Sequence, residues 1–118
     1  MRIGLLLVAA GMAFAVQAGS LEQDAFKVYR KIGVGPTQTE PFTQLYEEFV
    51  RYRNGQMRRV LNSRTGEEVS VVAKKKARRA AKKSVKKMRA VLSEEQLVYY
   101  AEYLELDNQI YLRNNGLR

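Results

Sequence analysis

The residues of this chain whose type and spacing could do chemistry are basic. Residues 74–89 read KKKARRAAKKSVKKMR and contain ten lysines and arginines with no acidic residue among them. Outside this run and apart from Arg2, ten basic residues stand against twelve acidic ones, so the formal net charge of +9 is concentrated in one segment. A field of that density attracts an anion or an anionic surface. The chemistry that the sequence predicts is anion binding.

Catalytic and metal chemistry find little support in the composition. The chain contains no Cys and no His, which removes the commonest transition-metal ligands and the usual pairs of nucleophile and base. No glycine-rich phosphate loop is visible in the sequence. An enzyme built on carboxylates alone ranks last among our hypotheses. We therefore expect a protein that is not an enzyme and that needs no cofactor.

The N-terminus predicts export. Arg2 gives a short positive region, residues 3–16 form an uncharged apolar run, and Val16-Gln17-Ala18 fits a signal-peptidase site. The apolar run is shorter than the roughly 20 residues of a spanning helix, and no Cys follows it as a lipoprotein would require. We expect a signal peptide over residues 1–18, a single all-helical domain over residues 19–118, and a periplasmic or secreted location.

Four helices and no strand are expected in the mature chain, which predicts a small all-α domain of the helical-hairpin type. Apolar periodicity places helices over residues 21–31 and 39–61, through the basic run, and from Ser93 to about residue 114. Gly33 ends the first helix, and Gly55 predicts a bend or break in the second. Thr65 and Glu68 fit a capping box before the basic helix.

The basic helix is amphipathic. On a helical wheel, residues 69–92 place alanines and other small or apolar residues on one half and most charges on the other. The predicted basic face for a partner comprises Lys75, Lys76, Arg78, Arg79, Lys82, Lys83, Lys86 and Arg89. Like charges recur at i, i+4 spacing, which costs helix stability, whereas a surface that only solubilises interleaves both signs. A merely solvated face is the alternative.

The rest of the sequence limits the kinds of anion that the basic face is expected to bind. Nucleic acid is disfavoured, because no aromatic residues interleave with the charges for base stacking and export separates the protein from cytoplasmic DNA and RNA. Anionic lipid or lipopolysaccharide would attract the basic face, although the alanines opposite the charges offer little to insert into a bilayer. A specific binder or inhibitor of one acidic protein is a further alternative.

The last predicted helix carries nearly two apolar stripes, where a surface helix needs one. The second stripe consists of Tyr99, Tyr103, Leu106 and Ile110, and Phe49 belongs to a similar excess in the second helix. In one interpretation both stripes are buried, one within the domain and one in a homodimer. In the other, these five residues form an exposed apolar surface for a partner, since tyrosine combines contact area with a polar tip.

The segment Leu92-Ser93-Glu94-Glu95-Gln96 carries the most distinctive local pattern in the chain. Ser93 and Gln96 fit a capping box, with Leu92 positioned for a hydrophobic staple. The segment also resembles the L-T-x-x-Q motif of the Spy/CpxP-like periplasmic proteins, with Ser93 in place of the threonine. A second motif is expected near residues 35–40, where the leucine and the spacing are absent. A 58-residue echo pairs Gln38 with Gln96, Phe42 with Tyr100 and Glu47 with Glu105.

The resemblance implies a small exported helical protein that forms curved dimers and acts as an ATP-independent chaperone or a stress-response adaptor. The basic face would then attract unfolded acidic polypeptides, and tyrosine, leucine and phenylalanine side chains would hold their apolar segments loosely. We therefore expect an exported, homodimeric protein that binds other polypeptides.

Overall fold

The computed structural model describes residues 20–63 and 67–117. Its elements are four helices, α2 (Ser20–Ile32), α3 (Thr39–Ser63), α4 (Glu67–Met88) and α5 (Glu94–Asn114). The predicted all-α fold with four helices is thus confirmed for this part of the chain. The predicted signal peptide and the proposed cap at Thr65 lie outside the described residues.

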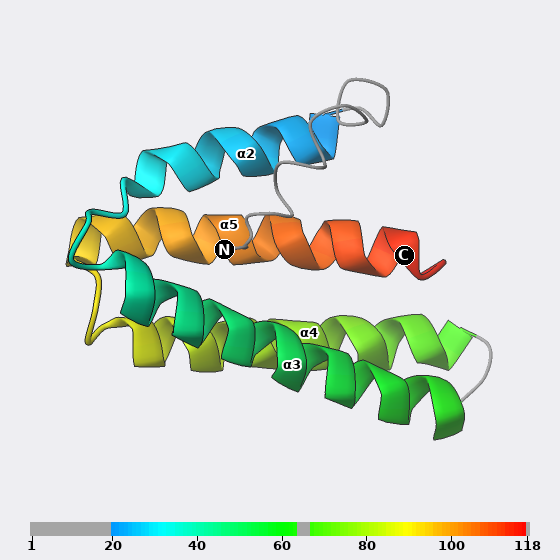
Figure 1. Ribbon diagram of the computed structural model, residues 1–118. Helices are drawn as coiled ribbons and strands as arrows, with labels where there is room; N and C mark the ends of the chain where they lie inside the picture. Colours follow the sequence, from blue (N-terminus) through cyan, green and yellow to red (C-terminus); the bar gives the residue numbers. More distant parts are fainter. Residues whose placement is uncertain (1–19, 64–66, 118) are drawn as a thin grey trace.

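The helices form two layers, and each layer consists of two antiparallel helices. Helix α2 packs on α5, α3 packs on α4, and α4 also contacts α5 (Figure 1). The turns that connect α2 to α3 and α4 to α5 lie at the same end of the bundle, while the C-terminus lies at the opposite end (Figure 1). Helices α3 and α5 consequently run in the same direction.

Helix α2 is short and is held against α5 by one face. Ala25, Val28 and Ile32 recur at helical spacing and are buried. The helix ends at Gly33 as predicted, because this glycine adopts a φ of 62°, which other residues rarely adopt. Near the other end, Glu22 pairs with Arg113 of α5. This ion pair ties the start of α2 to the last turn of α5.

Helix α3 runs without interruption through Gly55, so the predicted break at this glycine is wrong. A glycine in a helix costs at most about 1 kcal/mol relative to alanine. The residues on either side are firmly packed, since Met57 and Val60 are buried in a core cluster and Phe49 is buried in another. Tertiary packing of this kind outweighs a single unfavourable propensity.

Small residues let α4 approach its neighbours closely. Ala73, Ala77 and Ala80 are buried at helical spacing along its inner face, which suits close packing between helices. The helix ends at Met88, one residue before the end of the basic run, and the main chain then turns through residues 89–92. Arg89 therefore lies in this turn and not on the helix.

Helix α5 begins and ends at the residues that the sequence predicts. The amide of Gln96 donates to Ser93 Oγ at 3.2 Å and the amide of Ser93 donates to Gln96 Oε1 at 2.9 Å, which completes the capping box. At the C-terminus, Gly116 adopts a φ of 75°. The amide of Leu117 donates to the carbonyl of Leu112 at 2.8 Å, as in a Schellman motif.

The 58-residue echo has a structural counterpart in the core. The rings of Phe42 and Tyr100, which are 58 residues apart, meet edge to face with centroids 5.5 Å apart. The guanidinium carbon of Arg53 lies 4.1 Å from the ring centroid of Tyr111, again 58 residues on. At these two pairs of positions, side chains of α3 and α5 therefore meet inside the bundle.

Candidate anion-binding surface

The bundle positions the basic side chains by burying the other side of α4. Because its alanines face α3 and α5, the lysines and arginines must point outward. Lys76 is partly buried, and the other predicted members of the basic face are exposed: Lys75, Arg78, Arg79, Lys82, Lys83, Lys86 and Arg89. The structure therefore brings seven of the eight predicted residues together on one helix, with Arg89 on the turn that follows it.

Few of these charges are neutralised by the protein's own carboxylates. Arg89 pairs with Glu94 at 2.9 Å, and the neighbouring Lys87 pairs with Glu48 at 3.2 Å. Within residues 20–63 and 67–117, no ion pair involves the seven basic-face residues of α4, which are Lys75, Lys76, Arg78, Arg79, Lys82, Lys83 and Lys86. The surface therefore keeps a strong positive field that a partner could neutralise.

The second stripe of α5 is covered by α2 of the same chain. Tyr103 is only 9 % exposed, and its ring centroid lies 5.4 Å from that of Tyr29 on α2. Tyr99, Leu106 and Ile110 are partly buried against the same core. The sequence pattern predicted burial of this stripe in a homodimer or its exposure to a partner. The cover by α2 could not be predicted, because that contact joins residues far apart in the chain.

Phe49 also lies inside the protein. Its side chain is 3 % exposed, and its ring centroid lies 6.0 Å from that of Tyr46. Phe49 and Tyr103 therefore cannot form an exposed apolar surface for a partner in this conformation, which corrects that part of the predicted site. The surplus of aromatic residues builds the core instead.

A polar network lies within the bundle beside these rings. Arg53 is 5 % exposed and donates to Asp107 at 2.9 Å and to Asn108 at 3.2 Å. The hydroxyl of Tyr46 donates to the same Asp107 carboxylate at 3.2 Å. Burial raises the pKa of Tyr46 well above its ordinary value, so this hydroxyl stays protonated. Every member of the network has partners, which indicates a structural role.

The motif residues join the two turns at one end of the bundle. The side chain of Gln96 donates to the carbonyls of Ile32 and Gly33, at 3.0 and 3.2 Å. Leu92 is buried in the core, while Ser93 caps α5. The motif therefore has an evident structural role, which is to fix the α4–α5 turn against the α2–α3 turn.

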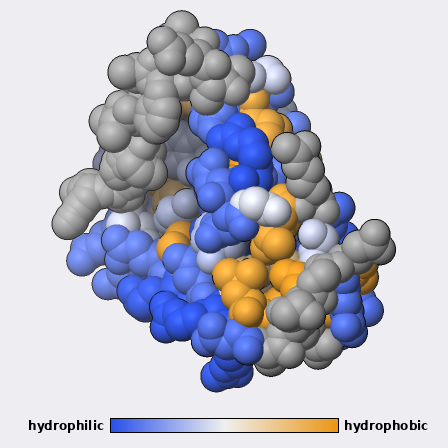
Figure 2. Space-filling model, turned by 90° about the vertical axis from the view of Figure 1, so that its right-hand side faces the viewer, coloured by the Kyte–Doolittle hydropathy of each residue, from blue (hydrophilic) through white to orange (hydrophobic). Residues whose placement is uncertain are grey.

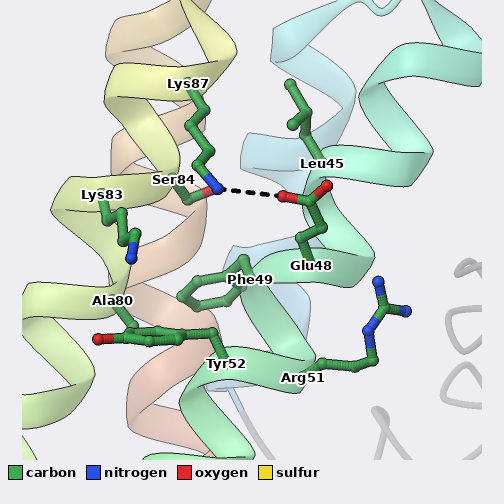
Figure 3. A pocket seen from close by; sticks show the side chains of 9 residues that line it. All are labelled: Leu45, Glu48, Phe49, Arg51, Tyr52, Ala80, Lys83, Ser84 and Lys87. Atoms are coloured by element: carbon green, nitrogen blue, oxygen red, sulfur yellow. Dashed lines mark hydrogen bonds and ion pairs between the residues drawn. The ribbon is translucent and has the colours of Figure 1, made fainter.

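A groove that was not predicted from the sequence lies between α3 and α4 (Figure 3). It has a volume of about 220 Å³. Leu45, Phe49 and Tyr52 line it from α3, and Ala80, Lys83 and Lys87 line it from α4. The ammonium of Lys83 lies 4.5 Å from the ring centroid of Tyr52, within the range of a cation–π contact. The groove thus opens directly onto the basic face.

A second hollow of about 510 Å³ lies between α2, α4 and α5. Leu21, in the first turn of α2, and Leu117, the last residue that the structure describes, both line it. Figure 2 shows the end of the bundle that carries the α3–α4 connection, where hydrophobic patches interrupt a mostly hydrophilic surface. Leu61, near the end of α3, and Val71, near the start of α4, have exposed side chains and lie close in sequence to this connection.

No group of three or more acidic side chains in the described part of the chain could hold a metal ion. Among the four described helices, none is both long and apolar enough to cross a membrane. Comparisons of the chain with protein-family models, with curated proteins and with solved structures give no match.

Proposed function

We propose that this chain is an exported protein that binds other polypeptides, as an ATP-independent periplasmic chaperone or envelope stress-response factor. The observation that carries the proposal is the basic face of α4, whose seven cationic side chains have no carboxylate partner in the described part of the chain. Like charges gathered on one helix cost stability. A face of this kind is best explained by a partner of opposite charge.

The sequence pattern supports the same class of protein. The Spy/CpxP-like resemblance rests on Leu92, Ser93 and Gln96, and the capping box that this motif describes is formed. The predicted signal peptide would place the protein where exported polypeptides must fold. No nucleotide is required, because the proposed binding relies on charge and on apolar contact alone.

A polypeptide suits this surface better than a bilayer does. The small residues of α4 that could face acyl chains are buried in the bundle, so this helix cannot insert its apolar side. Attachment to anionic lipid or lipopolysaccharide would rest on charge alone. A polypeptide could use both the charges and the apolar groove beside them.

The proposed mechanism has two stages. The basic face first attracts acidic segments. The range of this attraction is set by the Debye screening length, which is about 8 Å at physiological ionic strength. Short-range apolar contacts then hold the segment. Exposed ion pairs contribute at most about 1 kcal/mol each, so a client is held weakly and can be released to fold.

Suppression of aggregation by the purified mature chain tests this proposal. A denatured acidic enzyme is diluted into buffer with equimolar mature chain, and light scattering is recorded. The double variant Lys82→Glu with Lys86→Glu should lose most of the suppression, because it reverses two exposed charges of the basic face. The matched control reverses two exposed charges elsewhere, Lys27→Glu with Arg58→Glu, and should retain it.

Two results would count against polypeptide binding. One is the absence of suppression by the unaltered chain at an equimolar ratio. The other is an equal loss in both double variants, which would mean that net charge alone matters. Co-sedimentation with anionic vesicles, without any effect on aggregation, would replace the proposal with an envelope-binding function.

A further inference from the structure

We infer that the groove between α3 and α4 holds an apolar side chain of a bound polypeptide, while carboxylates that flank this side chain pair with the lysines at the rim. The inference rests on the proposed function and makes it more specific. It names a recognition element, an apolar residue between acidic ones, and a place for it on this chain. Four features of the groove carry the inference.

The floor of the groove is apolar. Leu45 and Tyr52 of α3 supply the accessible hydrocarbon surface, and the buried Phe49 and Ala80 close the floor beneath it. The hydroxyl of Ser84, which also lines the groove, is already hydrogen bonded to the hydroxyl of Tyr100 at 2.6 Å. No buried side-chain polar atom among the described residues lacks a partner. The floor therefore gains more from an apolar occupant than from a polar one.

The size of the groove favours a side chain over a cofactor. Pockets for drug-sized ligands occupy roughly 300–1,000 Å³, and this groove has only about 220 Å³. Tyr52 forms one wall and is 42 % exposed, so its ring can cover an inserted side chain. Figure 3 shows the ring lying across the groove below Lys83.

The rim of the groove is positively charged. Arg51, Lys83 and Lys87 line it together with a single acid, Glu48. Lys83 contacts the ring of Tyr52 and has no ion pair within the described residues. This charge complements an acidic segment and repels a basic one.

The ion pair between Lys87 and Glu48 can be exchanged. Their side chains keep about half of their surface exposed, 50 % and 47 %, and pairs of this kind contribute little to stability. A client carboxylate could therefore replace Glu48 as the partner of Lys87 at little cost. Together with Lys83, this provides two cations for the acids on either side of the inserted residue.

A tryptophan reporter tests occupancy of the groove. The chain contains no Trp, so Tyr52→Trp introduces a single tryptophan at the groove, whose emission can be excited selectively over that of the tyrosines. Val98→Trp, at an exposed position on α5, serves as the control. The probes are three synthetic peptides of equal length: acidic with a central leucine, acidic with a central serine, and basic with a central leucine.

The acidic peptide with leucine should shift the emission of Tyr52→Trp to the blue and protect it from acrylamide. The other two peptides should do so much less, and the emission of Val98→Trp should not change. Equal responses to the leucine and serine peptides would overturn the inference, because binding would then depend on the charge of the peptide and not on its apolar side chain. A response in Val98→Trp equal to that in Tyr52→Trp would overturn it as well.

Charge reversal measures the contribution of the rim in a chain that keeps Tyr52. Lys83→Glu should weaken binding of the labelled acidic leucine peptide at least about fivefold, the equivalent of about 1 kcal/mol. Lys75→Glu makes the same change in net charge more than two helical turns away and should weaken it by no more than about twofold. Circular dichroism confirms that both variants are folded.

The outcomes separate this inference from the proposed function. If Lys83→Glu and Lys75→Glu weaken binding equally, the groove is not the site, although polypeptide binding by the basic face stands. If the unaltered chain neither binds the acidic peptides nor suppresses aggregation, the proposed function fails, and the inference fails with it.

Discussion

The side-chain amides of Gln38 and Gln96 donate hydrogen bonds to each other, both at 3.0 Å. Each glutamine also closes the turn to which it belongs. Gln38 Oε1 accepts from the amide of Gly35 and Gln96 Oε1 accepts from the amide of Ser93, both at 2.9 Å. The two turns are thus built alike, with each glutamine three residues after the amide that it accepts from.

The remaining donors cross from one turn to the other. Gln38 Nε2 donates to the carbonyl of Val91 at 2.9 Å, and Gln96 Nε2 donates to that of Gly33 at 3.2 Å. Gly33 and Val91 are themselves 58 residues apart, as are the two glutamines. The hydrogen bonds of the α2–α3 turn are therefore repeated, with the same spacing, by those of the α4–α5 turn.

Removal of one glutamine should destabilise this end of the bundle. We expect Gln96→Ala to lower the free energy of unfolding by about 1–3 kcal/mol, because partly buried carbonyls and the amide of Gln38 lose their partner. Chemical denaturation measures the change. Gln109→Ala is the control, since this exposed glutamine makes only one long hydrogen bond, 3.4 Å to Glu105. Similar losses in the two variants would contradict a structural role for the pair.

Replacement of Gly55 should stabilise the protein. The helix is continuous at this position, and an added Cβ would have no atom within 4 Å. Gly55→Ala should therefore raise the free energy of unfolding by about 0.5–1 kcal/mol, because alanine favours a helix more than glycine does. Thermal unfolding followed by circular dichroism measures it. A lower melting temperature for Gly55→Ala would indicate that α3 bends here in solution.

Replacement of Gly116, in contrast to that of Gly55, should destabilise the protein. This glycine has a φ of 75°, a conformation that alanine adopts only with strain. Gly116→Ala should therefore lower stability, and a change of the same sign at both glycines would contradict this assignment of their conformations.

Burial of Arg53 in the folded protein should depend on its ion pair with the carboxylate of Asp107. Asp107→Asn preserves the shape of the side chain but leaves the charge of Arg53 without its partner, and Arg53 is buried. We expect a loss of about 2–3 kcal/mol in the free energy of unfolding, since breaking one side of a buried ion pair is costly. Glu48→Gln breaks the exposed pair with Lys87 and should cost less than about 1 kcal/mol. Equal costs would show that the Arg53 network contributes nothing beyond a surface pair.

Stability should fall in alkaline solution. Burial raises the pKa of Tyr46, Tyr100 and Tyr103 above the ordinary value of 10.0. The folded state therefore holds protons that the unfolded state loses above pH 10. The contribution of these tyrosines to the free energy of unfolding is fully present below this pH and is lost as the pH rises towards their folded-state pKa values. The loss amounts to at most about 1.4 kcal/mol per pH unit for each tyrosine.

Tyr103→Phe checks this dependence, because it removes one of the three hydroxyls. Stability measured by denaturation above pH 10 should fall less steeply with pH in the variant than in the unaltered chain. An unchanged slope would mean that Tyr103 ionises as easily in the folded protein as in the unfolded one.

The number, type and most limits of the helices could be predicted from the sequence. These features depend on interactions between residues close in the chain, such as the capping box of Ser93 and Gln96 and the positive φ of Gly33 and Gly116. The outward face of α4 was also predictable, because helical geometry separates its lysines from its alanines whatever the helix packs against.

The tertiary structure decided which apolar faces are covered and where a groove is left. Tyr103 is buried because α2 lies across it, and Gly55 stays helical because its neighbours pack in the core. The groove exists because Tyr52 and Lys83 come from different helices that pack side by side. Such contacts join residues distant in the chain, and their energy depends on three-dimensional packing, which no local pattern of residues encodes.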